Sequence, residues 1–117
     1  DTPVALSSPE LTVQGILRAA EASDAEWGPR TALNLPSLLT TTGEMASALE
    51  RVAGSQVSAL IDWTPDPVIM KIVATWPARV NAARARGLGL LPPQSFDSIV
   101  REYIRENPDA VKRAAAA

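Results

Sequence analysis

TALNLPSLLTTTGEMASALERVAG, residues 31–54, carries the clearest structural signal in the chain. Residues 31–35 predict a short strand, which Pro36 ends because proline has no amide hydrogen to donate to a ladder. Thr41 and Glu44 have the spacing of a capping box, so a helix is expected to follow Thr41. The last glycine of the stretch is expected to end this helix. Its apolar side chains fall on one face, at i, i+3, i+4 and i+7: Met45, Ala48, Leu49 and Val52.

Upstream, the sequence predicts a short strand at residues 4–6 and a helix that begins at Pro9. Ser8 is expected to cap this helix, proline suits its first position, and the carboxylate of Glu10 suits the positive end of its dipole. A glycine-proline step at 28–29 then breaks the chain. The apolar residues of the helix fall on one face: Leu11, Val13, Ile16, Leu17 and Ala20.

Downstream, four more elements are predicted: a strand at 60–63 and helices at 67–75, at 82–88 and from 96 to the Asn107-Pro108 break. Asp66, Asn81 and Ser95 are expected to cap the three helices, and Gly89 is expected to stop the second. We expect apolar side chains of the first and third of these helices to be buried: Val68, Ile69, Ile72, Phe96, Ile99, Val100, Tyr103 and Ile104.

These elements describe an α/β chain that is rich in helices and has a few short strands. Helices between the strands could serve as crossovers for parallel pairing. Three short strands make a poor sheet alone, so we expect them to complete a sheet that lies mostly outside this chain. The chain is then expected to self-associate or to be poorly stable, because it would expose the leucines near Pro36: Leu33, Leu35 and Leu38.

Composition excludes several classes of function. The chain has neither cysteine nor histidine, which removes disulfides, thiolate and imidazole catalysis, and most zinc sites. A self-contained enzyme would depend on carboxylates, Tyr103, Lys71 or Lys112. Thirteen acidic residues outnumber eleven basic ones, so the surface as a whole does not favour nucleic acid or anionic membranes. No apolar run reaches the roughly 18 residues of a membrane span.

Residues 74–96 carry three arginines and no acidic residue. Arg84 and Arg86 lie within the predicted short helix, where a solvated basic face is the default interpretation. Arg79 differs, because it lies on irregular backbone between two predicted helices. A guanidinium there can form a two-pronged pair with a carboxylate or phosphate, so Arg79 is our candidate contact for an anionic ligand.

Four aromatic residues have alternative interpretations. Trp63 and Trp76 flank the predicted helix at 67–75, and they either anchor the core or line the mouth of a pocket. Trp27 is expected to plug a loop. Tyr103 is expected to pack in the core with its hydroxyl at the edge.

Several short motifs occur in order along the chain: LNLP (33–36), T-x-GEM (41–45), AL-x-x-VAG (48–54), W-x-PDP (63–67), WP-x-R (76–79), A-x-x-LG (85–89) and SFD-x-I (95–99). Together they resemble the C-terminal part of the extended short-chain dehydrogenase/reductases, also called the NAD-dependent epimerase/dehydratase family. Within it, nearly the whole chain is most similar to the D-erythronate dehydrogenase group. Glu10 departs from that group, which often has an arginine after the Ser-Pro step.

The resemblance implies a helix-rich C-terminal lobe of a Rossmann-type enzyme. In such enzymes an N-terminal Rossmann domain binds NAD or NADP through a glycine-rich loop, and a Tyr-x-x-x-Lys pair performs the chemistry. This chain contains neither motif, so no catalytic, cofactor-binding or metal-binding residue is assigned. Residues 1–107 would be the substrate-binding portion, with 31–54 as the last strand-helix unit of the Rossmann sheet, and 108–117 would be a loose tail.

By the same resemblance, Arg79 matches an arginine that contacts the anionic group of the substrate in many relatives. Trp76 would form a wall of the pocket, and Arg84 completes the expected substrate-binding set. The implied partners are a small anionic substrate, either a hydroxy acid or a sugar derivative, and the missing Rossmann domain. A homo-oligomer is left open, neither nucleic acid nor a membrane is expected, and the resemblance implies a cytoplasmic protein.

The competing interpretation is a stand-alone, non-enzymatic interaction module. Its working surface would be an apolar groove between amphipathic helices. The chain begins at Asp1 rather than at methionine, which fits either a removed leader or a piece of a longer protein.

Overall fold

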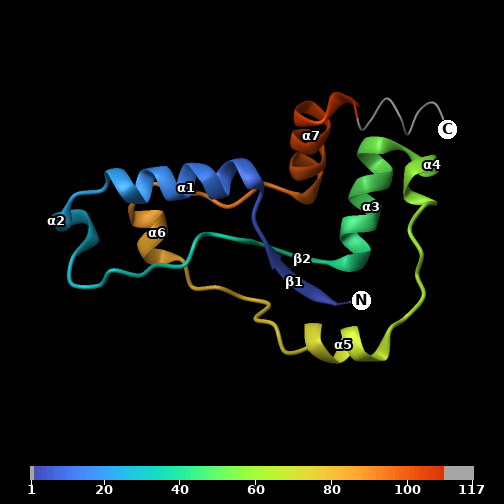
Figure 1. Ribbon diagram of the computed structural model, residues 1–117, viewed down its shortest axis with the longest axis horizontal. Coiled ribbons are helices and arrows are strands. Elements are labelled where there is room, and N and C mark those ends of the chain that lie inside the picture. Colours follow the sequence, from blue (N-terminus) through green and yellow to red (C-terminus); the bar gives the residue numbers. More distant parts are fainter. Residues whose placement is uncertain (1, 110–117) are drawn as a thin grey trace.

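The computed structural model describes residues 2–109, in which helices surround one small sheet (Figure 1). The elements in chain order are β1 (Pro3–Leu6), α1 (Pro9–Glu21), α2 (Asp24–Trp27), β2 (Leu38–Thr41), α3 (Thr42–Ala53), α4 (Ser55–Ser58), α5 (Pro67–Val73), α6 (Ala83–Gly87) and α7 (Phe96–Glu106). The expected α/β, helix-rich class is confirmed. Over the described residues, no helix combines the length and the apolar character that a membrane crossing requires.

The sheet consists of β1 and β2, which pair antiparallel with Pro3 opposite Thr41 and Leu6 opposite Leu38. The parallel pairing suggested by the intervening helices is therefore not found among these residues. Antiparallel pairing brings the end of β2 close to the start of β1, so α3 begins beside the first described residues (Figure 1).

Two predicted strands are wrong. The strand expected at residues 31–35 is absent, and β2 begins only at Leu38, after Pro36. The strand expected at 60–63 is also absent: residue 60 ends the turn that follows α4, and residues 61–63 have no regular structure. A strand requires a neighbouring backbone with which to exchange hydrogen bonds. Within residues 2–109, only β1 and β2 find such a neighbour.

Four helices begin at their predicted caps, whereas α6 begins one residue later than predicted, with Ala82 and not Asn81 at the N-cap position. Each cap oxygen accepts a hydrogen bond of 2.8–3.2 Å from an amide of the first turn, at Ser8, Thr41, Asp66 and Ser95. These bonds satisfy amides that have no partner inside the helix. Gly54 and Gly89 follow α3 and α6 with φ of 92° and 84°, and glycine adopts such angles without a Cβ clash.

An ion-pair group joins α3 to α7, which pack against each other. Arg51, in the last turn of α3, donates to both carboxylate oxygens of Asp97 at 2.6 and 3.3 Å, and to Glu44 at 2.6 Å. The hydrogen bonds from Arg51 hold the pKa of Asp97 below its ordinary value. Ala48 on α3 and Val100 on α7 are buried, so the two helices contribute a small apolar cluster to the core.

The main core cluster is built on α6 and the turn after it, and it contains Ala82, Ala85, Leu88 and Leu90, with Ala22, Leu33 and Leu35 packed against it. Leu33, Leu35 and Leu38 are half-buried. The expectation that these leucines are exposed is therefore wrong. Leu33 and Leu35 reach the cluster because α6 lies close to the connection between α2 and β2.

Exposed apolar side chains lie elsewhere instead. The predicted burial is wrong for α5 and Tyr103, and the apolar face predicted on α1 is also uncovered; these residues are 53–69% exposed: Val13, Ile16, Leu17, Val68, Ile69, Ile72 and Tyr103. The radius of gyration is 17.0 Å, against roughly 13 Å for a compact domain of this length. The described chain is therefore open, and two of its helices present apolar faces that a compact domain would cover.

Candidate functional site

Arg79 lies in the connection between α5 and α6, which contains no helix or strand from residue 74 to residue 82 (Figure 1). Its side chain is exposed, and it forms neither a hydrogen bond nor an ion pair with any residue in the range 2–109. All five N–H groups of the guanidinium are therefore available to an acceptor from outside the described chain. This is the property that the sequence interpretation required of an anion contact.

Trp76 lies three residues before Arg79 in the same connection. Its amide donates to the carbonyl of Val73 at 3.0 Å, which ends the last turn after α5. Its side chain is 59% exposed, so Trp76 does not anchor the core. An exposed aromatic side chain and an exposed guanidinium in the same connection can offer a ligand an apolar contact and a charged one.

Arg84, on α6, has a different environment. Its guanidinium donates to the backbone carbonyls of Trp27 at 2.6 Å, of Arg30 at 2.8 Å and, in a closer contact, of Ala32. All three carbonyls belong to the end of α2 and the connection that follows it. The structure thus places Arg84 against the protein's own backbone, a contact that no local sequence pattern indicates.

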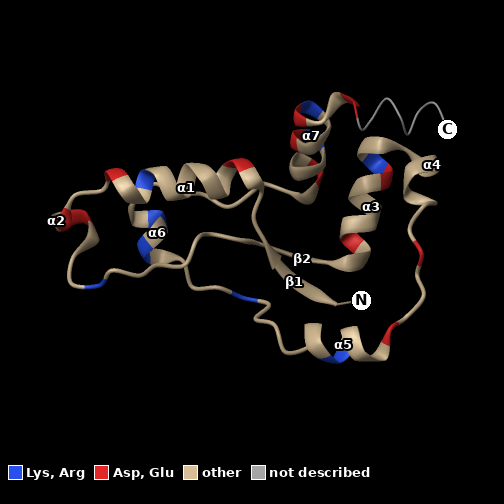
Figure 2. Ribbon diagram, viewed as in Figure 1, with Lys and Arg blue, Asp and Glu red and all other residues tan. Residues whose placement is uncertain are grey.

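The segment that contains Trp76, Arg79 and Arg84 carries only positive side-chain charges. Residues 67–96 contain four basic side chains and no acidic one, although the whole chain has a net charge of −2. Figure 2 shows this as a run from α5 through α6 that is marked by blue and has no red. A locally positive segment on an acidic protein attracts small anions more strongly than its net charge suggests.

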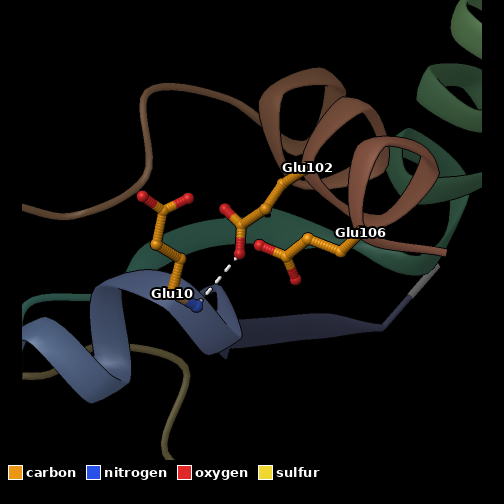
Figure 3. A group of neighbouring side chains, drawn as sticks. All are labelled: Glu10, Glu102 and Glu106. Atoms are coloured by element: carbon orange, nitrogen blue, oxygen red, sulfur yellow. Dashed lines mark hydrogen bonds between the residues drawn. The ribbon is translucent and has the colours of Figure 1, made fainter.

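An acidic cluster of Glu10, Glu102 and Glu106 lies where α7 meets the first turn of α1 (Figure 3). The carboxylate of Glu102 accepts a hydrogen bond from the amide of Glu10 at 3.0 Å, and Arg105 pairs with Glu10 at 2.7 Å. Glu102 therefore satisfies a free amide at the positive end of α1. The cluster has a structural role in docking α7 on α1.

Sequence reasoning missed a full capping box at Ser23 and Glu26. The one predicted at Thr41 and Glu44 is only half formed, since the Glu44 carboxylate pairs with Arg51. The amide and the hydroxyl of Ser23 donate to the carboxylate of Glu26 at 2.8 and 2.9 Å, while the amide of Glu26 donates to the hydroxyl at 3.4 Å. The bond from the Ser23 amide, followed by the bonds from Arg18 and from the Ser23 hydroxyl, lowers the pKa of Glu26 to about 2. The Ser-x-x-Glu spacing could have revealed this start of α2.

An apolar groove of about 560 Å³ lies between α3, α7 and residues 61–63, and its lining includes Met45, Leu49, Trp63, Phe96, Val100 and Tyr103. Trp63 is 62% exposed, so it lines this groove and does not anchor the core. Trp27, in contrast, is half-buried, and its indole donates to the carbonyl of Ala19 at 3.1 Å. This groove is the surface that the competing interpretation expected.

The sequence is similar to two curated proteins over most of its length. It is 38% identical over 106 residues to D-erythronate dehydrogenase from Cupriavidus necator. It is 29% identical over 99 residues to D-erythronate dehydrogenase from Haemophilus influenzae. The chain is related to part of the D-erythronate dehydrogenases. The resemblance predicted from the motifs is thus confirmed, although no family model matches the chain.

The similarity covers 91% and 85% of this chain but only 33% and 31% of the two D-erythronate dehydrogenases. The chain therefore spans about a third of the length of these relatives. Its fold is similar to the crystal structure of a nucleoside-diphosphate-sugar epimerase from Agrobacterium tumefaciens, with a TM-score of 0.86 and 33% identity. That match covers 92% of this chain and 31% of the epimerase chain.

Proposed function

We propose that the chain is the C-terminal, substrate-binding part of an NAD(P)-dependent oxidoreductase or epimerase. The observation that carries this proposal is the 38% identity to a D-erythronate dehydrogenase across 91% of the chain. The parent protein would transfer hydride between a nicotinamide and a hydroxyl-bearing carbon of a small hydroxy acid or sugar derivative. Because this chain lacks the glycine-rich loop and the Tyr-x-x-x-Lys pair, its share of the reaction is to bind and orient the substrate.

In this proposal Arg79 binds the anionic group of the substrate and Trp76 forms a wall beside it. The unpaired guanidinium of Arg79 supports the first role, and the exposed indole of Trp76 supports the second. A substrate contact for Arg84 stays a prediction. The three carbonyls that Arg84 already binds favour a supporting position for it instead.

The missing partner would be an N-terminal Rossmann domain that binds NAD or NADP. We propose that residues 31–54 are the last strand-helix unit of its sheet, so that residues 31–35 gain a strand conformation only beside that domain. The exposed apolar faces of α1 and α5 support this assignment, since a covering domain would remove them from water. The tail predicted at 108–117 lies mostly outside the described residues.

The test is a titration of the isotope-labelled 117-residue chain with D-erythronate, followed by NMR. We expect the Arg79 Nε and Trp76 indole signals to shift, and the substitution Arg79→Gln to weaken binding about tenfold or more through the loss of a charge-assisted pair. Arg86→Gln, a matched loss of an exposed arginine, should leave binding unchanged. Equal binding by the Arg79→Gln and wild-type chains would contradict the assignment of Arg79, and NAD binding by this chain would contradict the division of roles.

The apolar groove between α3 and α7 favours a second candidate, an interaction module that binds an amphipathic helix. The gene distinguishes the two candidates. A glycine-rich fingerprint and a Tyr-x-x-x-Lys motif encoded upstream of Asp1 would support the enzyme. A start codon or a secretory leader immediately upstream would support the module.

A further inference from the structure

Three hydrogen bonds from one side chain connect parts of the chain that are far apart in sequence. The guanidinium of Arg84 reaches carbonyls 52 to 57 residues earlier in the sequence. The planar guanidinium presents five donors in a rigid fork, whereas a lysine ammonium is a compact point charge on a flexible stem. The two terminal nitrogens of the Arg84 fork lie far enough apart to bind three separate carbonyls of one backbone loop at the same time.

A second tie lies three residues from Arg84. The side-chain amide of Asn34 donates to the carbonyl of Asn81 at 3.3 Å, and the side chain of Asn81 accepts from the amide of Ala83 at 3.1 Å, at the start of α6. The segment 81–84 is therefore bonded to the segment 27–34 at two places. Arg79 lies just before this fastened segment.

We infer that Arg84 is a positioning residue, which fixes the segment that carries Arg79 against the connection between α2 and β2. The consequence for ligand binding rests on the proposed function of Arg79. The ties at 81–84 hold one end of the irregular connection from 74 to 82, and the last turn of α5 holds the other. A segment that is ordered before binding loses less conformational entropy when it receives a ligand, so fixing it strengthens binding.

The inference is tested first without any ligand, by hydrogen exchange of the 117-residue chain. We expect Arg84→Gln to accelerate exchange of the hydrogen-bonded backbone amides in residues 27–34 and 76–82, those of Trp27, Gly28 and Trp76. Arg84→Lys should do the same, because it keeps the charge and loses the fork. Arg86→Gln is the matched control: its side chain lies on the same helix, is exposed and has no partner among residues 2–109, so it should leave exchange unchanged.

The second arm measures binding of D-erythronate in a double-mutant cycle. If Arg84 acts through Arg79, then Arg84→Gln weakens binding about fivefold to tenfold in the wild-type background and has no further effect in the Arg79→Gln background. A purely structural role of Arg84 would not produce that dependence. The amide signals of α3 and α7 serve as the check that each variant is folded, because these helices contain none of the carbonyls that Arg84 binds.

The outcomes separate the two proposals. Unchanged exchange in both Arg84 variants would overturn the positioning role, whatever binding shows. Equal weakening by Arg84→Gln in both backgrounds would also overturn it, because Arg84 would then affect binding independently of Arg79. If wild type fails to bind D-erythronate while Arg84→Gln still accelerates exchange, the assignment of Arg79 fails and the structural tie stands.

Discussion

Three arginines of one short region have three different environments. Arg79 is exposed and unpaired among the described residues, Arg84 binds three backbone carbonyls, and Arg86 extends from α6 without a partner. The sequence singled out Arg79 correctly as the one on irregular backbone, because proline and a cap residue mark that position locally. It could not show that Arg84, unlike Arg86, is hydrogen-bonded, since the carbonyls that Arg84 binds lie 52 to 57 residues earlier in the sequence.

Another single residue, Glu26, is predicted to make the stability of the fold depend on pH in the acid range. Its pKa is lowered from 4.5 to about 2 in the folded chain, so its ionised form stabilises the fold fully above pH 4.5. This contribution is lost as the pH falls from there towards 2, when the carboxylate is protonated. Glu26→Gln should therefore lower the Tm at pH 6, and the difference from wild type should shrink towards pH 2.5.

The matched control for Glu26 is Glu21→Gln, which removes an exposed carboxylate at the end of α1 that has no partner among the described residues. Its Tm should follow that of the wild type at every pH. A Tm difference for Glu26→Gln that stays constant from pH 6 to pH 2.5 would show that the capping box, and not the charge, is responsible.

Among the elements, the sequence predicted the starts of the helices well and the strands poorly. Ser8, Thr41 and Ser95 act on amides within the next few residues, so the sequence around each of them contains the whole interaction. The strands at 31–35 and 60–63 were wrong because pairing depends on a distant backbone. The predicted burial of α5 failed for a related reason: an apolar face indicates that something covers it, and among the described residues nothing covers this helix.

The packing of α3 on α7 is predicted to depend on the pair of Arg51 and Asp97. Arg51→Gln and Asp97→Asn should each lower the Tm, and the double variant should lower it no further than the more harmful single change, since both remove the same interaction. The effect should decrease in high salt, because the pair is partly solvated. Thermal unfolding followed by circular dichroism measures all three.

Glu50→Gln provides the control for this cycle. Its side chain is exposed on α3 and has no partner among residues 2–109, so it should change the Tm little. Additive effects of the Arg51 and Asp97 substitutions would indicate that the two side chains act independently, and the proposed link between the helices would then be rejected.

The whole molecule is more open than its length requires, with a radius of gyration of 17.0 Å. The related D-erythronate dehydrogenases are about three times longer than the matched segment. These facts together support the proposal that a further domain covers α1 and α5. In this proposal Arg79 and Trp76 form only part of the substrate pocket, and its remaining walls belong to that domain.

For the isolated chain, we predict self-association driven by these apolar faces. Sedimentation velocity should show an average mass that rises with concentration, and Ile16→Lys combined with Ile69→Lys should reduce the rise, since both residues are more than half exposed. Gln14→Lys, on a polar position of α1, adds a charge without removing apolar area and should have little effect. A monomer at all concentrations with a cooperative, high-temperature melt would refute the proposal of a missing covering domain.

The hydrogen bond from the Glu10 amide to the Glu102 carboxylate joins residues 92 positions apart, and this has a consequence for the order of synthesis. At a translation rate of about 5–20 residues per second, roughly 5–20 s pass between the two residues. During that interval the amide of Glu10 lacks the carboxylate acceptor that it has in the folded chain. This hydrogen bond of the first turn of α1 can therefore form only after α7, near the end of the described chain, has been synthesised.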